Sequence, residues 1–88
     1  MFAVLPATLP ESELIRRIVD ADAAVLMKMG RHLPKVRRVL ERTGRLGRAV
    51  YIERGTMNGA KAMPLIEKKD DLAPYFAMVL VPGWEARP

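Results

Sequence analysis

Hydrophobic residues change their spacing within residues 23–40, and the change predicts a strand followed by a helix. Ala23 to Met27 form an unbroken apolar run between charged residues, which is typical of a short strand buried on both faces. From Pro34 onward the apolar positions recur with the 3.6-residue period of an amphipathic helix. The two elements are joined by residues 28–33, a short loop that contains a glycine.

The rest of the pattern predicts one further helix and several further strands. A capping box formed by Thr8 and Glu11 is expected to start a helix that extends to about Asp20. Gly44 is expected to end the helix that begins near Pro34. Residues 75–81 are the most apolar segment and are expected to form a central strand. The other expected strands are residues 2–5, residues 48–53 and a short strand, interrupted at Pro64, within residues 62–66.

This order of elements predicts the α/β class, with a mixed sheet flanked by helices. Ligands of such sheets usually bind beside the loops that follow the carboxyl ends of strands. The loops 28–33 and 54–59 occupy such positions and contain glycines, which permit close approach of the backbone. We therefore expect a flat heterocycle such as adenine, held by main-chain hydrogen bonds. Met27 and Met29 would either pack around that ring or fill the core.

Positive charge is concentrated around the second predicted helix. The 88-residue chain has a formal net charge of +5, and residues 31–48 contain seven Lys or Arg residues and one acid, Glu41. A solvated helix face, a nucleic-acid footprint and attraction of a polyanionic small molecule each account for this charge. Aromatic residues make up 6% of the chain, and Tyr51 and Phe76 fall in predicted strands, so a stacking surface for nucleic acid has little support.

Several functional classes are excluded by the residues that the chain lacks. It contains no cysteine and a single histidine, His32, which is too few ligands for a zinc site. No nucleophile stands beside a base and an orienting acid, so we assign no catalytic residue and no metal site. The chain has no apolar run long enough to span a membrane, and its first residues do not form a leader peptide, so we expect a cytoplasmic location.

Four segments in combination resemble a known family. They are VLPATLPESEL, LMKMGRHLPKVRRVL, VYIERGTM and APYFAMVLVPGW, at residues 4–14, 26–40, 50–57 and 73–84. Together they are similar to the C-terminal part of the tetrapyrrole (corrin/porphyrin) methylases. The resemblance implies a homodimeric two-domain α/β enzyme. That enzyme transfers a methyl group from S-adenosylmethionine to C20 of the tetrapyrrole precorrin-2, or of its cobalt-containing counterpart, in cobalamin biosynthesis.

The resemblance also implies a site and its extent. Residues 1–82 would be an incomplete C-terminal domain and residues 83–88 a loosely held tail. Because the N-terminal domain of the family has no counterpart here, the isolated chain is expected to be inactive. The residues implied to contact S-adenosylmethionine are Met27, Lys28, Met29, Gly55, Thr56 and Tyr75.

Two interpretations from other functional classes stay open at this point. One is a small basic nucleic-acid-binding domain, which depends on the charge of residues 31–48. The other is a dimerisation module, because an incomplete domain leaves a sheet edge exposed.

Overall fold

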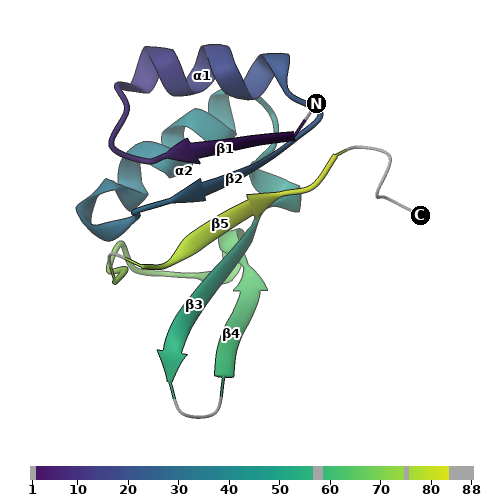
Figure 1. Cartoon of the computed structure of the whole chain (residues 1–88). Helices are drawn as coiled ribbons and strands as arrows, with labels where there is room; N and C mark the ends of the chain where they lie inside the picture. The colour runs from purple at the N-terminus through teal and green to yellow at the C-terminus, as the bar shows by residue number, and fades with distance from the viewer. Residues whose placement is uncertain (1, 57–58, 75, 84–88) are drawn as a thin grey trace.

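The computed structural model describes residues 2–56, 59–74 and 76–83, and for residues 54–56 and 59–61 it describes the backbone alone. Figure 1 shows a sheet with two helices packed against it. The strands are β1 (Phe2–Pro6), β2 (Ala23–Met27), β3 (Val50–Thr56), β4 (Gly59–Pro64) and β5 (Met78–Val81), and the α-helices are α1 (Glu11–Asp20) and α2 (Leu33–Arg42). Single 3₁₀ turns lie at Gly30–His32, Leu46–Arg48 and Leu65–Glu67.

The five strands form one mixed sheet in the order β1-β2-β5-β3-β4. Strands β1 and β2 are parallel, whereas β5 is antiparallel to both of its neighbours, β2 and β3. Strands β1, β2 and β3 therefore run in the same direction, and their carboxyl ends lie toward the same edge of the sheet. The predicted fold class is confirmed, and β5 is the central strand, as the apolar pattern of residues 75–81 indicates.

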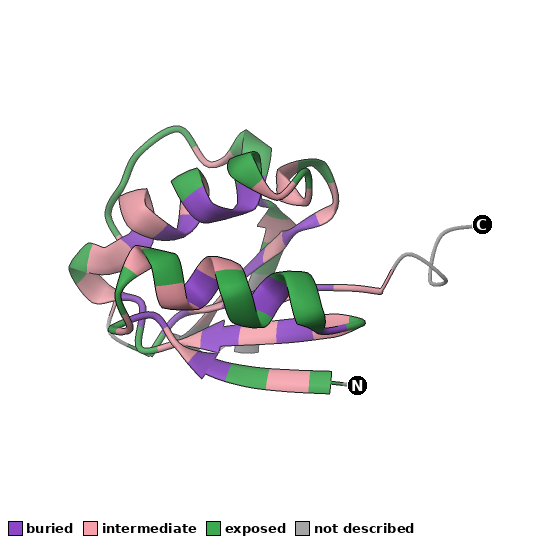
Figure 2. Cartoon of the chain, turned by 90° about the horizontal axis from the view of Figure 1, so that it is seen from above, coloured by how far each residue is buried: buried purple, intermediate pink, exposed green. Residues whose placement is uncertain are grey.

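The core lies between the two helices and one face of the sheet. Leu14 and Ile18 of α1 and Val36 of α2 are among the completely or almost completely buried side chains. In Figure 2 the buried stretches of both helices face the strands, and the exposed stretches face outward. Burying an aliphatic side chain of this size contributes about 1.5–3 kcal/mol, so this layer contributes substantially to stability.

The end of α2 follows the prediction made for Gly44. Its φ of +74° is left-handed, which a residue without a Cβ adopts at little cost. The Gly44 N–H donates to the Glu41 carbonyl, and the Arg45 N–H donates to the Leu40 carbonyl. These two bonds form a Schellman motif, which satisfies carbonyls at the end of the helix.

Several predicted boundaries differ from the observed ones. The capping box is wrong, since Pro10 is the N-cap of α1 and no side chain caps that end. Helix α2 begins one residue before Pro34, after a 3₁₀ turn. Strand β3 continues three residues beyond Glu53 to form a hairpin with β4, and β5 begins at Met78 rather than residue 75. Among the described residues, no helix is both long and apolar enough to cross a membrane.

Arg37 ties α2 to the segment that follows β4. Its guanidinium donates to the Lys68 carbonyl at 2.8 Å and to the Asp70 carbonyl at 2.6 Å. It also donates to the Leu65 carbonyl at 3.4 Å and to Asp71 Oδ1 at 3.0 Å. The side chain is 23% exposed, so these bonds are partly shielded from water. Arg37 thus holds a segment that has little regular structure of its own.

We expect Gly44→Ala to lower the free energy of unfolding by about 1 kcal/mol, because a Cβ is unfavourable at a left-handed φ. Gly47→Ala is the matched control, since Gly47 is not left-handed and a Cβ would meet nothing within 4 Å at either position. Urea unfolding of the two variants measures the difference. Equal losses of stability would contradict the role given to the Gly44 conformation.

We expect Arg37→Ala to destabilise the chain by about 1–3 kcal/mol, because it removes bonds to carbonyl groups that stay partly shielded. The control is Arg38→Ala on the same helix. Arg38 is 56% exposed and pairs with Glu11, and such surface pairs contribute roughly 0–1 kcal/mol. Urea unfolding compares the variants. Equal losses in the free energy of unfolding for Arg38→Ala and Arg37→Ala would show that the bonds of Arg37 contribute no more than an exposed ion pair.

Candidate functional site

The turn between β2 and α2 combines strained backbone with a buried side chain. Lys28 has a φ of +59° and Gly30 a φ of +42°, so two of three consecutive residues are left-handed. Left-handed backbone costs a non-glycine residue about 1–2 kcal/mol, and it persists where the surroundings enforce it. Here the surroundings include the core, because Met29 between them is completely buried.

Hydrogen bonds from other parts of the chain fix this turn. The Gly30 N–H donates to the Pro74 carbonyl at 3.3 Å, which attaches the turn to the segment before β5. The Ala7 N–H donates to the Met27 carbonyl at 2.8 Å, which attaches it to the segment after β1. The turn is therefore held by two parts of the chain that are remote from it in sequence. The bond to Pro74 could not be foreseen from the sequence, because residue spacing does not reveal which loops meet.

The predicted site residues differ in their exposure. Lys28 is exposed and Met27 is half-buried, so both are accessible to a ligand. Met29 is completely buried, which confirms the interpretation that its side chain fills the core. A ligand at this turn would contact Met27, Lys28 and Gly30, while the buried Met29 side chain would fix the turn to the core.

Gly55 and Thr56 lie in β3 rather than in a loop, and this corrects the expected loop at residues 54–59. Thr56 pairs with Gly59 in the hairpin, after a register irregularity between Glu53 and Thr56. Figure 1 shows the β3–β4 hairpin projecting beyond the rest of the sheet. The structure therefore places both residues toward the same sheet edge as the β2–α2 turn but on a projecting arm. Tyr75 lies outside the described residues, next to Pro74.

Positive charge surrounds the turn and affects its only histidine. The pKa of His32 is lowered from its usual value by partial desolvation first, and then by the charges of Lys35 and Arg31. The pKa of Lys35 is also lowered, mainly by desolvation, and its Nζ donates to the Leu9 carbonyl at 2.6 Å. The positive charges of Lys28 and Arg31 at this turn favour an anionic or electron-rich ligand.

Much of the basic charge of residues 31–48 is engaged within the chain. Arg37 and Arg38 bind acceptors outside α2, and Arg45 Nη1 donates to the Thr43 carbonyl. Arg48 Nε donates to the Pro82 carbonyl at 2.9 Å. These bonds engage donors that phosphates would need, so the cluster is a weaker footprint for nucleic acid than its composition indicates.

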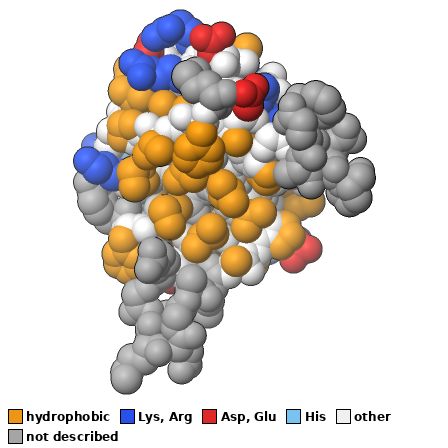
Figure 3. Space-filling model, turned by 45° about the vertical axis from the view of Figure 1, so that its right-hand side comes forward, with side chains coloured by type: hydrophobic (Ala, Val, Ile, Leu, Met, Phe, Trp, Pro, Cys, Tyr) orange, Lys and Arg blue, Asp and Glu red, His pale blue; other side chains and the backbone are white. Residues whose placement is uncertain are grey.

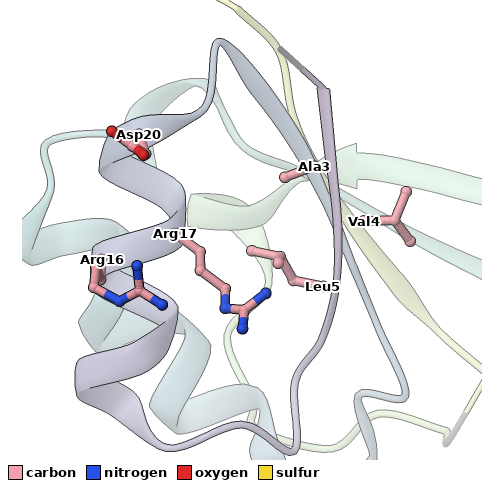
Figure 4. A pocket seen from close by; sticks show the side chains of 6 residues that line it. All are labelled: Ala3, Val4, Leu5, Arg16, Arg17 and Asp20. Carbon is pink, nitrogen blue, oxygen red and sulfur yellow. The ribbon is translucent and has the colours of Figure 1, made fainter.

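Two surface depressions among the described residues lie away from the turn. One, of about 240 Å³, is lined by Leu5 and its neighbours on β1 and by Arg16 and Arg17 on α1 (Figure 4). The other, of about 280 Å³, is lined by Tyr51, Lys68 and neighbouring residues. Small-molecule sites usually occupy about 300–1,000 Å³, so neither depression forms a complete pocket for a ligand the size of S-adenosylmethionine.

Comparison with known proteins identifies what the chain is similar to. No family model matches. All 88 residues align at 59% identity with the precorrin-2 C(20)-methyltransferase of a Sinorhizobium species, and they span 36% of that protein. The chain resembles the C-terminal part of a precorrin-2 C(20)-methyltransferase. It spans about a third of the length of this relative, so the remaining two thirds of such a protein has no counterpart in the chain.

Other relatives agree with this resemblance. The cobalamin biosynthesis protein CobIJ of Mycobacterium tuberculosis is 42% identical over 87 residues, which are 17% of its length. The cobalt-precorrin-2 C(20)-methyltransferase of Salmonella typhimurium is 33% identical over 86 residues, which are 36% of its length. The crystal structure of the methyltransferase CobJ superposes with a TM-score of 0.71 at 18% identity, covering 99% of this chain and 43% of that one. The last match supports the fold alone.

We expect Lys28→Gly to raise the free energy of unfolding by about 0.5–1 kcal/mol, because glycine relieves the left-handed strain at this position. Lys69→Gly is the control, since Lys69 is exposed and does not have a positive φ. Urea unfolding measures both variants. A loss of stability in Lys28→Gly would mean that the lysine side chain stabilises the turn by more than its backbone strain costs.

Proposed function

We propose that the chain acts as the C-terminal part of a methyltransferase that converts precorrin-2 into precorrin-3A by methylating C20. The observation that carries the proposal is the 59% identity with the Sinorhizobium precorrin-2 C(20)-methyltransferase, which extends over the whole chain. Identity with the cobalt-precorrin-2 enzyme is 33%, and this difference favours the cobalt-free substrate.

S-adenosylmethionine is the proposed methyl donor, and it supplies an electrophilic methyl group on a sulfonium. Met27 and Lys28 are accessible at the end of β2, and the resemblance adds Gly55, Thr56 and Tyr75. We assign Met29 to positioning, because its burial fixes the turn that would receive the adenosyl group. The positive charge of Lys28 and Arg31 would also favour the carboxylates of a tetrapyrrole.

The chain supplies one wall of the proposed site. Methyl transfer requires the donor and acceptor to be held in line, and such positioning accounts for much of the rate enhancement. The isolated chain is therefore proposed to be inactive. A homodimeric, cytoplasmic enzyme is part of the same proposal.

The second candidate is a small basic nucleic-acid-binding domain, based on the net charge of +5. The internal bonds made by Arg37, Arg38 and Arg48 argue against it, because they occupy donors that phosphates would need. Binding of single-stranded or duplex nucleic acid that weakens with added salt would favour this candidate over the methyltransferase.

The proposal is tested with a chimera in which this chain replaces the matched third of the Sinorhizobium enzyme. We expect the chimera to convert precorrin-2 into precorrin-3A with S-adenosylmethionine, and the isolated chain to show no conversion. Gly55→Val in the chimera should weaken S-adenosylmethionine binding by about tenfold, since a β-branched side chain would hinder close approach of the ligand to the backbone.

Gly47→Val is the control for this substitution, because Gly47 lies in the 3₁₀ turn before β3 and a Cβ there meets nothing within 4 Å. Calorimetry gives the two affinities. A folded chimera without methyl transfer would refute the proposed function, and equal affinities of the two variants would remove Gly55 from the site.

A further inference from the structure

One face of the sheet is apolar across all five strands, and neither helix of the described residues lies on it (Figure 2). The register places Val4, Val25, Leu80, Val50 and Pro64 in one row that crosses β1, β2, β5, β3 and β4. Each of these residues is half-buried or exposed. Figure 3 shows hydrophobic side chains gathered over the middle of the molecule, with charged side chains toward the margin.

The neighbouring residues extend this row into a surface, which we call the open face. Ile52 pairs with Met78, and Phe2 pairs with Ala23, on the same side of the sheet. Phe2 is 58% exposed and Val4 is 57% exposed. The alternate residues Leu26 and Val79 point to the opposite side, where they are buried with the helices. Figure 4 likewise shows Val4 directed away from α1, whereas Leu5 is directed toward it.

A contiguous apolar face that crosses a whole sheet indicates a surface that packs against another layer. Monomeric proteins rarely leave contiguous apolar patches larger than a few hundred Å² in water, and larger patches usually mark interfaces. The continuous apolar runs in β2 and β5 predict strands covered on both faces, yet helices α1 and α2 cover the same single face. A second layer, supplied by other polypeptide, would cover this face.

We propose that the open face packs against the part of a precorrin-2 C(20)-methyltransferase that this chain lacks. The inference rests on the proposed function for the identity of that partner. The same stretch is 36% of the Sinorhizobium protein and 17% of CobIJ, so both relatives contain additional polypeptide that can supply the missing layer. Packing against that layer would join the two walls of the methyltransferase site.

A second copy of this chain is the competing occupant. Two open faces could pair as a sandwich, since neither has a charged residue among its described side chains. The relatives favour the first occupant, because their additional polypeptide is covalently attached and its effective concentration is therefore high.

Methionine oxidation distinguishes the two sides of the sheet. Met78 is half-buried on the open face, and Met63 is half-buried on the side of the core, where it pairs with Tyr51. We expect hydrogen peroxide to oxidise Met78 at least about tenfold more slowly in the chimera than in the isolated chain, because a packed interface excludes the oxidant. Met63 should react at similar rates in both. Mass spectrometry gives the two rates, and light scattering gives the mass of the isolated chain.

Matched substitutions test the face directly. Val4 on the open face and Val19 on α1 are each 57% exposed. In the chimera Val4→Lys should raise the rate of Met78 oxidation about tenfold, because a buried lysine opposes packing of the open face. Val19→Lys should leave that rate unchanged. Circular dichroism of the isolated variants tests whether Val4→Lys leaves the chain folded. If Val4→Lys unfolds the chain, Val4→Thr replaces it, with Val19→Thr as its control.

Slow Met78 oxidation confined to the chimera supports the proposed interface. Equal Met78 rates in the chimera and a monomeric chain would overturn it, and so would an isolated chain that is dimeric and already protected at Met78. Methyl transfer by the chimera is measured separately: an inactive chimera with a protected Met78 would refute the function while leaving the interface intact.

Discussion

Burial of Met29 is the constraint on which the candidate site depends. The chain leaves β2 and must place this side chain in the core before α2 begins, so Lys28 and Gly30 take left-handed backbone on either side of it. The Gly30–Pro74 bond then fixes the turn against the segment before β5. The buried Met29 thus determines where the accessible backbone of Lys28 and Gly30 lies, although its own side chain points into the core.

The basic residues show how composition can mislead about function. Seven Lys or Arg residues within residues 31–48 resemble a polyanion footprint. In the structure Arg37 instead ties a segment of irregular backbone to α2, and Lys35 and Arg48 each donate to a main-chain carbonyl. Guanidinium groups are well suited to this use, because several donors in one plane can satisfy neighbouring carbonyls. The positive charge left near Lys28 is smaller and lies at the candidate site.

Sequence patterns predicted the fold better than the site. Apolar runs and helical spacing located β2, β5, α1 and α2, because burial selects residues along each element. The hairpin at Thr56 and Gly59 was missed, since glycine and asparagine permit a loop and a hairpin equally well. The positions that make up the site depend on contacts such as Gly30 with Pro74, which link residues 44 positions apart and leave no local pattern.

The apolar runs of β2 and β5 indicate strands that are covered on both faces, whereas the helices of the described fold cover one face of the sheet (Figure 2). Val25 and Leu80 would be unfavourable on a strand face that stays in water, yet they lie side by side near the centre of the sheet. If the chain evolved as part of a longer protein, Val25 and Leu80 would be retained, because their burial would contribute to the stability of that protein. The proposed catalysis likewise needs both sides of the site. Positioning one reactant accelerates the reaction only when the opposite side of the site holds the other reactant. On the proposed function, stability and activity would both depend on the layer that covers the open face.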